Sequence, residues 1–212
     1  ISYEEFGGVK PNPRLSFARE GVEKAIVFGA ELILAVGGGS AIDTAKGIAI
    51  GAANPGTDIW EFWKNKKELK TALPVGTVLT ISAAGSEMSN SAVLTDEETQ
   101  DKSGIGSDLI RPKFAIMNPK LTYTIPKYQL TCGIVDIFMH TIERYFTPVH
   151  GNELTDEIAE GLMRTLIRNA AKAYENQEDY DAMSEIMWCG SFSHNGITGL
   201  GRPKDFLCHK LG

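Results

Sequence analysis

The sequence predicts an α/β part followed by an all-helical part. Three short apolar runs, at residues 31–36, 73–79 and 114–117, alternate with helical patterns. This order is typical of a doubly wound, Rossmann-like parallel sheet. From residue 126 onwards the chain carries helical periodicity alone. We therefore predict two domains, residues 1–125 and 126–212.

The first half opens with a helical pattern at residues 15–28. The run ELILAV at 31–36 lies between glycines and lacks polar alternation, which predicts a strand buried on both faces. The sequence GGGS at 37–40 then turns the chain into a helix expected over 41–50, with Ser40 as its N-cap. Small polar residues follow the second apolar run, and Asn118 and Pro119 end the third.

In the second half, apolar residues recur at helical spacing over 127–146, 156–174 and 180–195. Each stretch is long enough for a helix of ordinary length. We therefore expect three helices and no strand after residue 126.

Composition narrows the class of protein. The net charge of −6 argues against binding to nucleic acid, which requires a basic surface. No apolar run is long enough to span a membrane, and no signal peptide is visible. The three cysteines, Cys132, Cys189 and Cys208, form no disulfide or metal motif, which favours a reducing compartment such as the cytoplasm.

The GGGS turn has the form of a phosphate-binding site. Glycines let a pyrophosphate approach the backbone, and the helix N-terminus offers free N–H groups. The turn lacks the GxGxxG fingerprint, so a tight turn without a ligand explains it equally well. Asp43, in the following helix, either reaches the ligand or complements the helix dipole.

Small residues and hydroxyls also follow the second apolar run, at residues 80–87. They suit the close approach of a nucleotide at the carboxyl end of a strand. Lys102 lies further along the chain, where a lone lysine is more often a surface charge than a ligand contact.

Asp136 and His140 are the residues most suggestive of chemistry. Four positions apart on a helix, they project from one face and can hold a divalent cation. A direct Asp–His hydrogen bond would satisfy the same pair. The remaining histidines, His150, His194 and His209, are undecided from pattern alone.

The motifs GGVKPNP, ILAVGGGSAIDTAK, AAGSEMSNSAVLTDEETQDK and GIVDIFMHTIERYF follow one another in this order. Together they resemble the iron-containing (group III) alcohol dehydrogenases, in particular the NAD(P)H-dependent butanol-dehydrogenase-like branch. The resemblance runs along essentially the whole chain. It implies a dehydroquinate-synthase-like architecture, with a dinucleotide-binding domain at residues 1–125 and a helical metal-binding domain at residues 126–212.

The resemblance also assigns residues to roles. It implies that the cofactor contacts are Gly37, Gly38, Gly39, Ser40, Asp43, Thr80, Ser86 and Lys102. It makes Asp136, His140 and His209 the metal ligands, with no catalytic residue beyond the metal site. The implied cofactors are NAD(P) and a divalent metal; the family name favours Fe(II), although Zn(II) suits the same ligands.

The implied reaction is hydride transfer between NAD(P) and a small primary alcohol or aldehyde, such as butanol or butyraldehyde, in a homodimer. The family's fourth metal ligand and its first βαβ unit fall outside the 212 residues. We therefore expect a fragment lacking both the first βαβ unit and the C-terminal helices. The alternatives are an inactive fragment or a nucleotide-binding remnant of such an enzyme and, less favoured, a dehydroquinate-synthase-like lyase.

Overall fold

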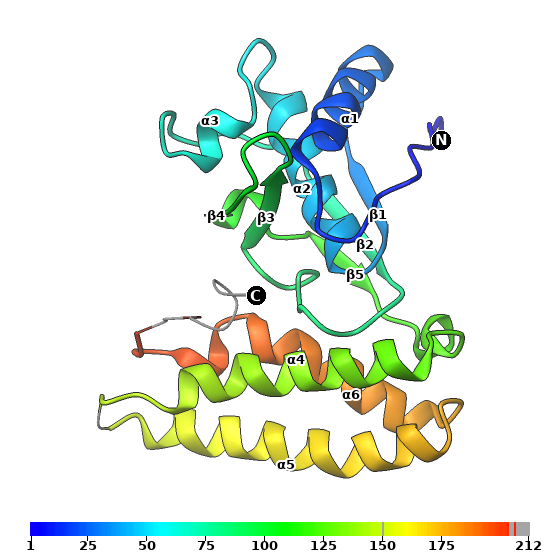
Figure 1. Cartoon of the computed structure of the whole chain (residues 1–212), viewed down its shortest axis with the longest axis vertical. Coiled ribbons are helices and arrows are strands. Elements are labelled where there is room, and N and C mark those ends of the chain that lie inside the picture. The colour runs from blue at the N-terminus through cyan, green and yellow to red at the C-terminus, as the bar shows by residue number, and fades with distance from the viewer. Residues whose placement is uncertain (150, 204–205, 207–212) are drawn as a thin grey trace. The chain divides into compact units, whose positions relative to one another are not determined.

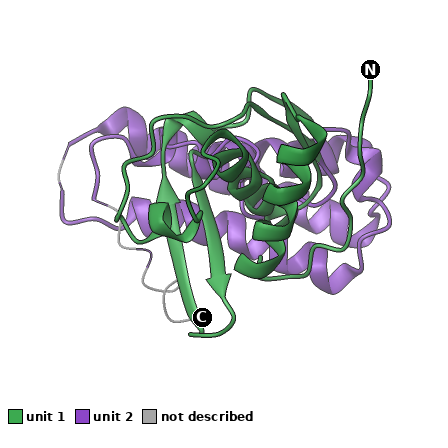
Figure 2. Cartoon of the chain, turned by 90° about the horizontal axis from the view of Figure 1, so that it is seen from above, with its two compact units in different colours: residues 1–78, 90–116 green, residues 79–89, 117–212 purple. Residues whose placement is uncertain are grey.

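The computed structural model of the chain describes residues 1–149, 151–203 and 206. They form two compact units, coloured green and purple in Figure 2. Unit 1 comprises residues 1–78 and 90–116, and unit 2 comprises residues 79–89 and 117–212. The loop 79–89 therefore packs with the helical part. These units are defined by packing. The single domain boundary near residue 125 that the sequence suggests stays a prediction.

Unit 1 is the α/β part. Its elements in chain order are α1 (Leu15–Phe28), β1 (Ile33–Gly37), α2 (Gly39–Ala53), α3 (Trp60–Trp63), β2 (Val75–Leu79), β3 (Ser91–Asp96), β4 (Asp101–Gly106), the 3-10 turn η1 (Asp108–Ile110) and β5 (Phe114–Ile116). Figure 1 shows α1 and α2 beside the strands of this unit. The predicted helix at 15–28 and the three predicted strands are confirmed.

Two sheets form in unit 1. The first has the strand order β1-β2-β5, and β2 pairs in parallel with β5 from Gly76 opposite Phe114 to Val78 opposite Ile116. The second is an antiparallel hairpin of β3 and β4. The sequence analysis missed this hairpin, although the alternation in β3 is visible: Ala92 and Leu94 are buried and their neighbours are less so.

Strand β1 differs from the prediction in its burial. Ala35 is buried, but Leu34 and Val36 are 49% and 63% exposed. Helix α2 packs on this strand, and among the described residues the side chains of the opposite face remain accessible. Burial on both faces is therefore wrong for the structure as described, because the strand alternates like one that is covered on one side.

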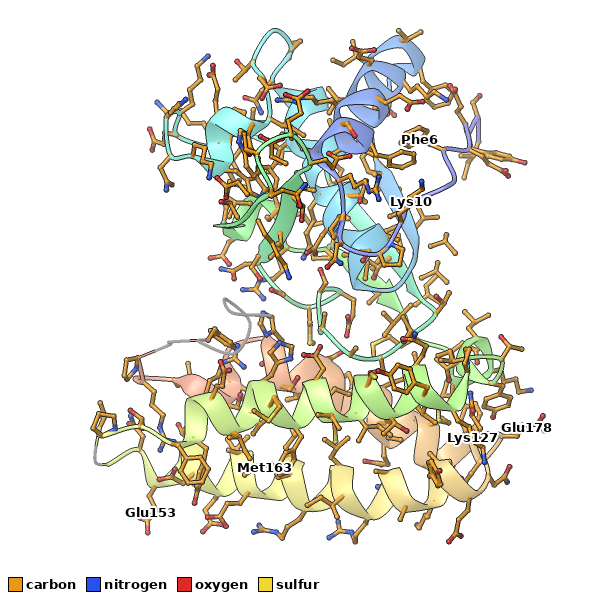
Figure 3. The ribbon with its side chains drawn as sticks, viewed as in Figure 1. Phe6, Lys10, Lys127, Glu153, Met163 and Glu178 are labelled. Carbon is orange, nitrogen blue, oxygen red and sulfur yellow. The ribbon has the colours of Figure 1, made fainter. Side chains whose placement is uncertain are left out.

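The core of unit 1 joins α1, α2, α3 and the hairpin. Its buried apolar residues are Leu15, Ala18, Ile50, Ile59, Phe62, Trp63, Ala92, Leu94 and Ile110. The segment before α1 lies against that helix: Phe6, labelled in Figure 3, stacks on Phe17 with ring centroids 4.4 Å apart. Apolar contacts thus hold the hairpin to the helices, while backbone hydrogen bonds join β3 to β4.

Unit 2 is the helical part. Its elements are the 3-10 turn η2 (Pro119–Thr122), α4 (Lys127–Tyr145), α5 (Glu153–Glu175), α6 (Tyr180–His194) and the 3-10 turn η3 (Ile197–Gly199). The three predicted helices are confirmed to within three residues at every end. In Figure 3, Lys127 at the start of α4 and Glu153 at the start of α5 lie at opposite ends of the unit, so these helices run antiparallel.

The helices of unit 2 share one apolar core. Its buried residues are Leu130, Ile137, Leu162, Leu166, Ala173, Ala182, Met183, Ile186 and Cys189. Asp179 caps α6, since its side chain accepts a hydrogen bond from the Ala182 N–H. Among the helices that the structure describes, none combines the length and the apolar character needed to cross a bilayer.

We predict that Ile137→Ala lowers the free energy of unfolding by about 2–5 kcal/mol, because Ile137 is fully buried in the core of unit 2. Val135→Ala is the matched control on the same helix, and its exposed side chain should change stability by less than about 0.5 kcal/mol. Urea unfolding followed by circular dichroism measures both. Equal effects of the two substitutions would contradict the described orientation of α4.

Candidate metal and cofactor site

The glycine turn lies between β1 and α2, as predicted. Gly37 has a φ of +156°, and a Cβ atom there would lie 2.6 Å from the Ala41 Cβ, so a larger residue does not fit. Helix α2 begins at Gly39, with Gly38 as its N-cap in an extended conformation. The prediction of Ser40 as N-cap is wrong, because the helix starts early enough to place Ser40 in its first turn.

Asp43 and Lys46, one turn apart on α2, are tied to strand β3. The Asp43 carboxylate accepts a hydrogen bond of 2.9 Å from the Val93 N–H. The Lys46 ammonium, which is fully buried, donates one of 2.8 Å to the Ser91 carbonyl. These bonds fix the start of α2 against the hairpin. A cofactor contact of Asp43 stays a prediction.

Lys102 lies on β4 of unit 1, opposite Thr95, with its side chain exposed. Thr80 and Ser86, the other predicted cofactor residues outside the glycine turn, belong to unit 2 instead. Ser86 is buried and Thr80 is half-buried. The predicted cofactor residues are thus distributed over both units.

Residues 79–89 are bound to helix α6 by hydrogen bonds. The Ser191 hydroxyl donates to the Glu87 carboxylate at 2.5 Å, and Glu87 is only 3% exposed. The Ser82 hydroxyl donates to the Ile186 carbonyl at 3.3 Å. A buried carboxylate is costly without such partners, so Glu87 is a strong attachment for the loop.

The same loop depends on Gly85. Its φ of +63° lies in the left-handed region, and a Cβ there would lie 2.7 Å from both the Gly190 carbonyl oxygen and the His194 Cβ. The loop backbone therefore touches α6 at the residue where that helix ends. His194 is consequently a neighbour of the predicted cofactor loop.

Asp136 and His140 lie one turn apart on α4, as expected. The distance from Asp136 Oδ1 to His140 Nε2 is 3.8 Å, which is too long for a direct hydrogen bond between them. Two ligand atoms at about 2.1 Å from one ion can be at most about 4.2 Å apart, so the pair fits a shared divalent cation. The His140 side chain is 4% exposed and that of Asp136 is 33% exposed.

A second histidine lies beside this pair. The ring of His194 has its centroid 4.5 Å from that of His140. The buried Arg144, four residues after His140, contacts both histidines. Burial lowers the pKa of the Arg144 guanidinium to about 10, which leaves it protonated at neutral pH. Sequence reasoning left His194 undecided; only the packing of α6 on α4 reveals its position.

The third predicted ligand, His209, lies outside the described residues, as does His150. Within residues 1–149, 151–203 and 206, no three histidine, cysteine or acidic side chains gather in a way that could hold a metal ion. The described part of the site therefore supplies two of the predicted ligands.

Comparison with known families decides the family. The family model described as iron-containing alcohol dehydrogenase matches residues 1–119, more than half of the chain. The model of the C-terminal part of the Fe-containing alcohol dehydrogenase family matches residues 131–212. The chain belongs to the iron-containing alcohol dehydrogenase family. The resemblance inferred from the sequence motifs is confirmed.

Individual relatives agree. The chain is 41% identical over 211 residues to NADH-dependent butanol dehydrogenase A of Clostridium acetobutylicum, covering 100% of this chain and 54% of that protein. It is 40% identical over 210 residues to the NADPH-dependent aldehyde reductase YqhD of Escherichia coli, covering 98% and 54%. The chain spans about half the length of these curated relatives.

A solved structure supports the fold. The crystal structure of NADH-dependent butanol dehydrogenase A from Thermotoga maritima matches with a TM-score of 0.95 and 40% identity, over 100% of this chain and 53% of that one. The predicted fold class, an α/β part followed by a helical part in this family's architecture, is confirmed.

We predict that Gly85→Ala destabilises the protein by about 1–3 kcal/mol, because alanine disfavours the left-handed conformation and its Cβ meets α6. Gly161→Ala on α5 is the control; open space surrounds that position, and alanine should stabilise the helix by up to about 1 kcal/mol. Thermal unfolding measures both. An unchanged melting temperature for Gly85→Ala would rule out the described packing of the loop.

Proposed function

We propose that the protein is a metal-dependent oxidoreductase that transfers a hydride between NAD(P) and a small primary alcohol or aldehyde, such as butanol or butyraldehyde. The observation that carries the proposal is the 3.8 Å approach of Asp136 and His140, in the same unit as the loop with Thr80 and Ser86. A carboxylate and an imidazole at this distance suit a divalent metal.

Asp136 and His140 would hold the metal, with His209 as a further ligand. Fe(II) is the metal we favour, and Zn(II) suits the same donors. When bound, a divalent metal supplies Lewis acidity to the oxygen of the alcohol or aldehyde. The burial of His140 fixes one ligand firmly, whereas the partial exposure of Asp136 leaves that side of the pair accessible.

The glycine turn would hold the cofactor's pyrophosphate. Gly38 and Gly39 present backbone at the start of α2 without side chains, and Ser40 lies in the first turn. Thr80 and Ser86 would contact the cofactor through their hydroxyls, and Lys102 through its ammonium group. Asp43 supports this site by its hydrogen bond to Val93.

Two further properties belong to this proposal. The names of the relatives include both NADH- and NADPH-dependent enzymes, so either nucleotide is a candidate cofactor. We also propose a homodimer in the reducing environment of the cytoplasm, where the free thiols of Cys132 and Cys189 would persist. Light scattering of the purified protein tests the oligomeric state.

The deciding experiment is an assay of butyraldehyde reduction with NADH and NADPH, on protein supplied with Fe(II) or Zn(II). Oxidation of either nucleotide that depends on both aldehyde and metal is the expected result. Metal-loaded protein that oxidises neither nucleotide would refute the proposed function.

We predict that Asp136→Ala and His140→Ala each remove most of the bound metal and most of the aldehyde-dependent turnover, because each deletes one of the two proposed ligands on α4. Glu157→Ala, which removes an exposed carboxylate on α5, is the control and should keep the wild-type metal content. Elemental analysis of the purified variants measures the metal. A full metal content in both Asp136→Ala and His140→Ala would show that the pair has a structural role and does not bind the metal.

We predict that Gly38→Val weakens NAD(P)H binding about tenfold or more. The backbone of Gly38 is extended, a conformation that valine also adopts, and the added side chain should keep phosphates from the N–H groups, each worth about 1.5–3 kcal/mol to a charged ligand. Gly106→Val, in open space on β4, is the control. Fluorescence titration with NADH and NADPH measures affinity; equal affinity of both variants would exclude the turn as the phosphate site.

A further inference from the structure

The buried guanidinium of Arg144 has unusual partners. Arg144 is 2% exposed, and within the described residues no salt bridge joins it to an acidic side chain. Its Nη1 instead donates to the carbonyls of His140, at 2.8 Å, and of Ser193. Its Nη2 lies 3.2 Å from His194 Nδ1. The guanidinium of Arg144 thus interacts with His140, with His194 and with the backbone at the end of α6.

The direction of the Arg144–His194 hydrogen bond follows from chemistry. A guanidinium has donors and no acceptor, so His194 Nδ1 must accept. A neutral imidazole that accepts at Nδ1 carries its proton on Nε2. Arg144 therefore selects the Nε2–H form of His194.

This form excludes His194 as a metal ligand through Nε2. A ligating histidine offers the lone pair of one ring nitrogen and donates the N–H of the other to an acceptor. His194 has the opposite arrangement, since the partner of its Nδ1 is a donor. It offers an N–H group where a ligand would offer a lone pair.

His194 lies among the residues predicted to form the metal and cofactor sites. Its ring lies against the ring of His140, and its Cβ lies against the position of Gly85 in the loop between Thr80 and Ser86. Phe206 covers the cluster: its ring centroid lies 5.9 Å from that of His194 and 4.8 Å from the guanidinium carbon of Arg144. His194 is therefore next to both the predicted metal ligand and the predicted cofactor loop.

We propose that Arg144 is a positioning residue that holds His194 in its Nε2–H form beside His140, and that His194 donates a hydrogen bond to the oxygen of the alcohol or aldehyde. The second part rests on the proposed function, because it requires a substrate oxygen at the metal. The first part concerns the protein alone.

Nitrogen-15 NMR tests the first part. The 212 residues contain four histidines, so long-range proton–nitrogen spectra of histidine-labelled protein with added Zn(II) resolve each ring, and His194→Gln assigns the signal. We expect an Nε2–H ring with an accepting Nδ1 in the wild type, and a mixture of tautomers in Arg144→Met. A wild-type ring protonated at Nδ1, or an unchanged tautomer in Arg144→Met, would overturn the positioning role. Arg144→Lys, which keeps the buried charge, replaces Arg144→Met if that variant fails to fold.

Kinetics and metal analysis test the second part. His194→Phe keeps an aromatic ring but removes the donor, and should lower kcat/KM for butyraldehyde about tenfold, the equivalent of one hydrogen bond of about 1.4 kcal/mol. His194→Gln, which retains an N–H donor, should recover most of that loss, and both variants should keep their metal. An unchanged kcat/KM in His194→Phe, or loss of metal from it, would refute the substrate contact. A wild type without turnover would refute the proposed function together with the contact, while the NMR measurement still decides the role of Arg144.

Discussion

The attachment of residues 79–89 to α6 determines what the helical unit contains. Glu87 and Ser82 hold the loop by hydrogen bonds to α6, and Gly85 permits its backbone to touch that helix. Without this attachment the proposed metal ligands on α4 and the hydroxyls of the loop would be unrelated parts of the sequence. With it, one compact unit carries residues proposed for the cofactor and for the metal.

Buried charges recur at the predicted site residues or within a few positions of them. Glu87, Arg144 and Lys46 are each less than 4% exposed, and each has a hydrogen-bonding partner that is distant in sequence. Desolvating such groups is expensive, and removing one partner is more costly than the bond itself is stabilising. These groups therefore favour one arrangement of the loop, the hairpin and the helices over alternatives that would leave a charge unpaired.

Sequence periodicity predicted the helices because their apolar faces are long and regular. It also predicted the Asp136–His140 pair, since residues four apart on a helix always share a face. The hairpin of β3 and β4 was missed because a short alternating run of small and polar residues resembles a loop. The contact of His194 with His140 could not be predicted, because it depends on how α6 packs on α4 across more than fifty residues of sequence. Burial of β1 was overestimated, because an apolar run shows that both faces of a strand can be buried but does not show whether other elements cover both.

The two proposed ligands, Asp136 and His140, differ in a way that suits catalysis better than structural support. A structural metal site encloses its ion on all sides, whereas a catalytic site keeps one side open for substrate. His140 is enclosed: its ring is buried, its carbonyl accepts from Arg144, and His194 and Phe206 lie against it. The Asp136 carboxylate, by contrast, is one-third exposed. An ion held by this pair would be fixed on the imidazole side and accessible on the carboxylate side. His194, which is half-buried, lies beside the His140 imidazole. The Nε2–H group that we assign to it is therefore next to the fixed side of the pair, and the partial burial strengthens a hydrogen bond to a substrate oxygen.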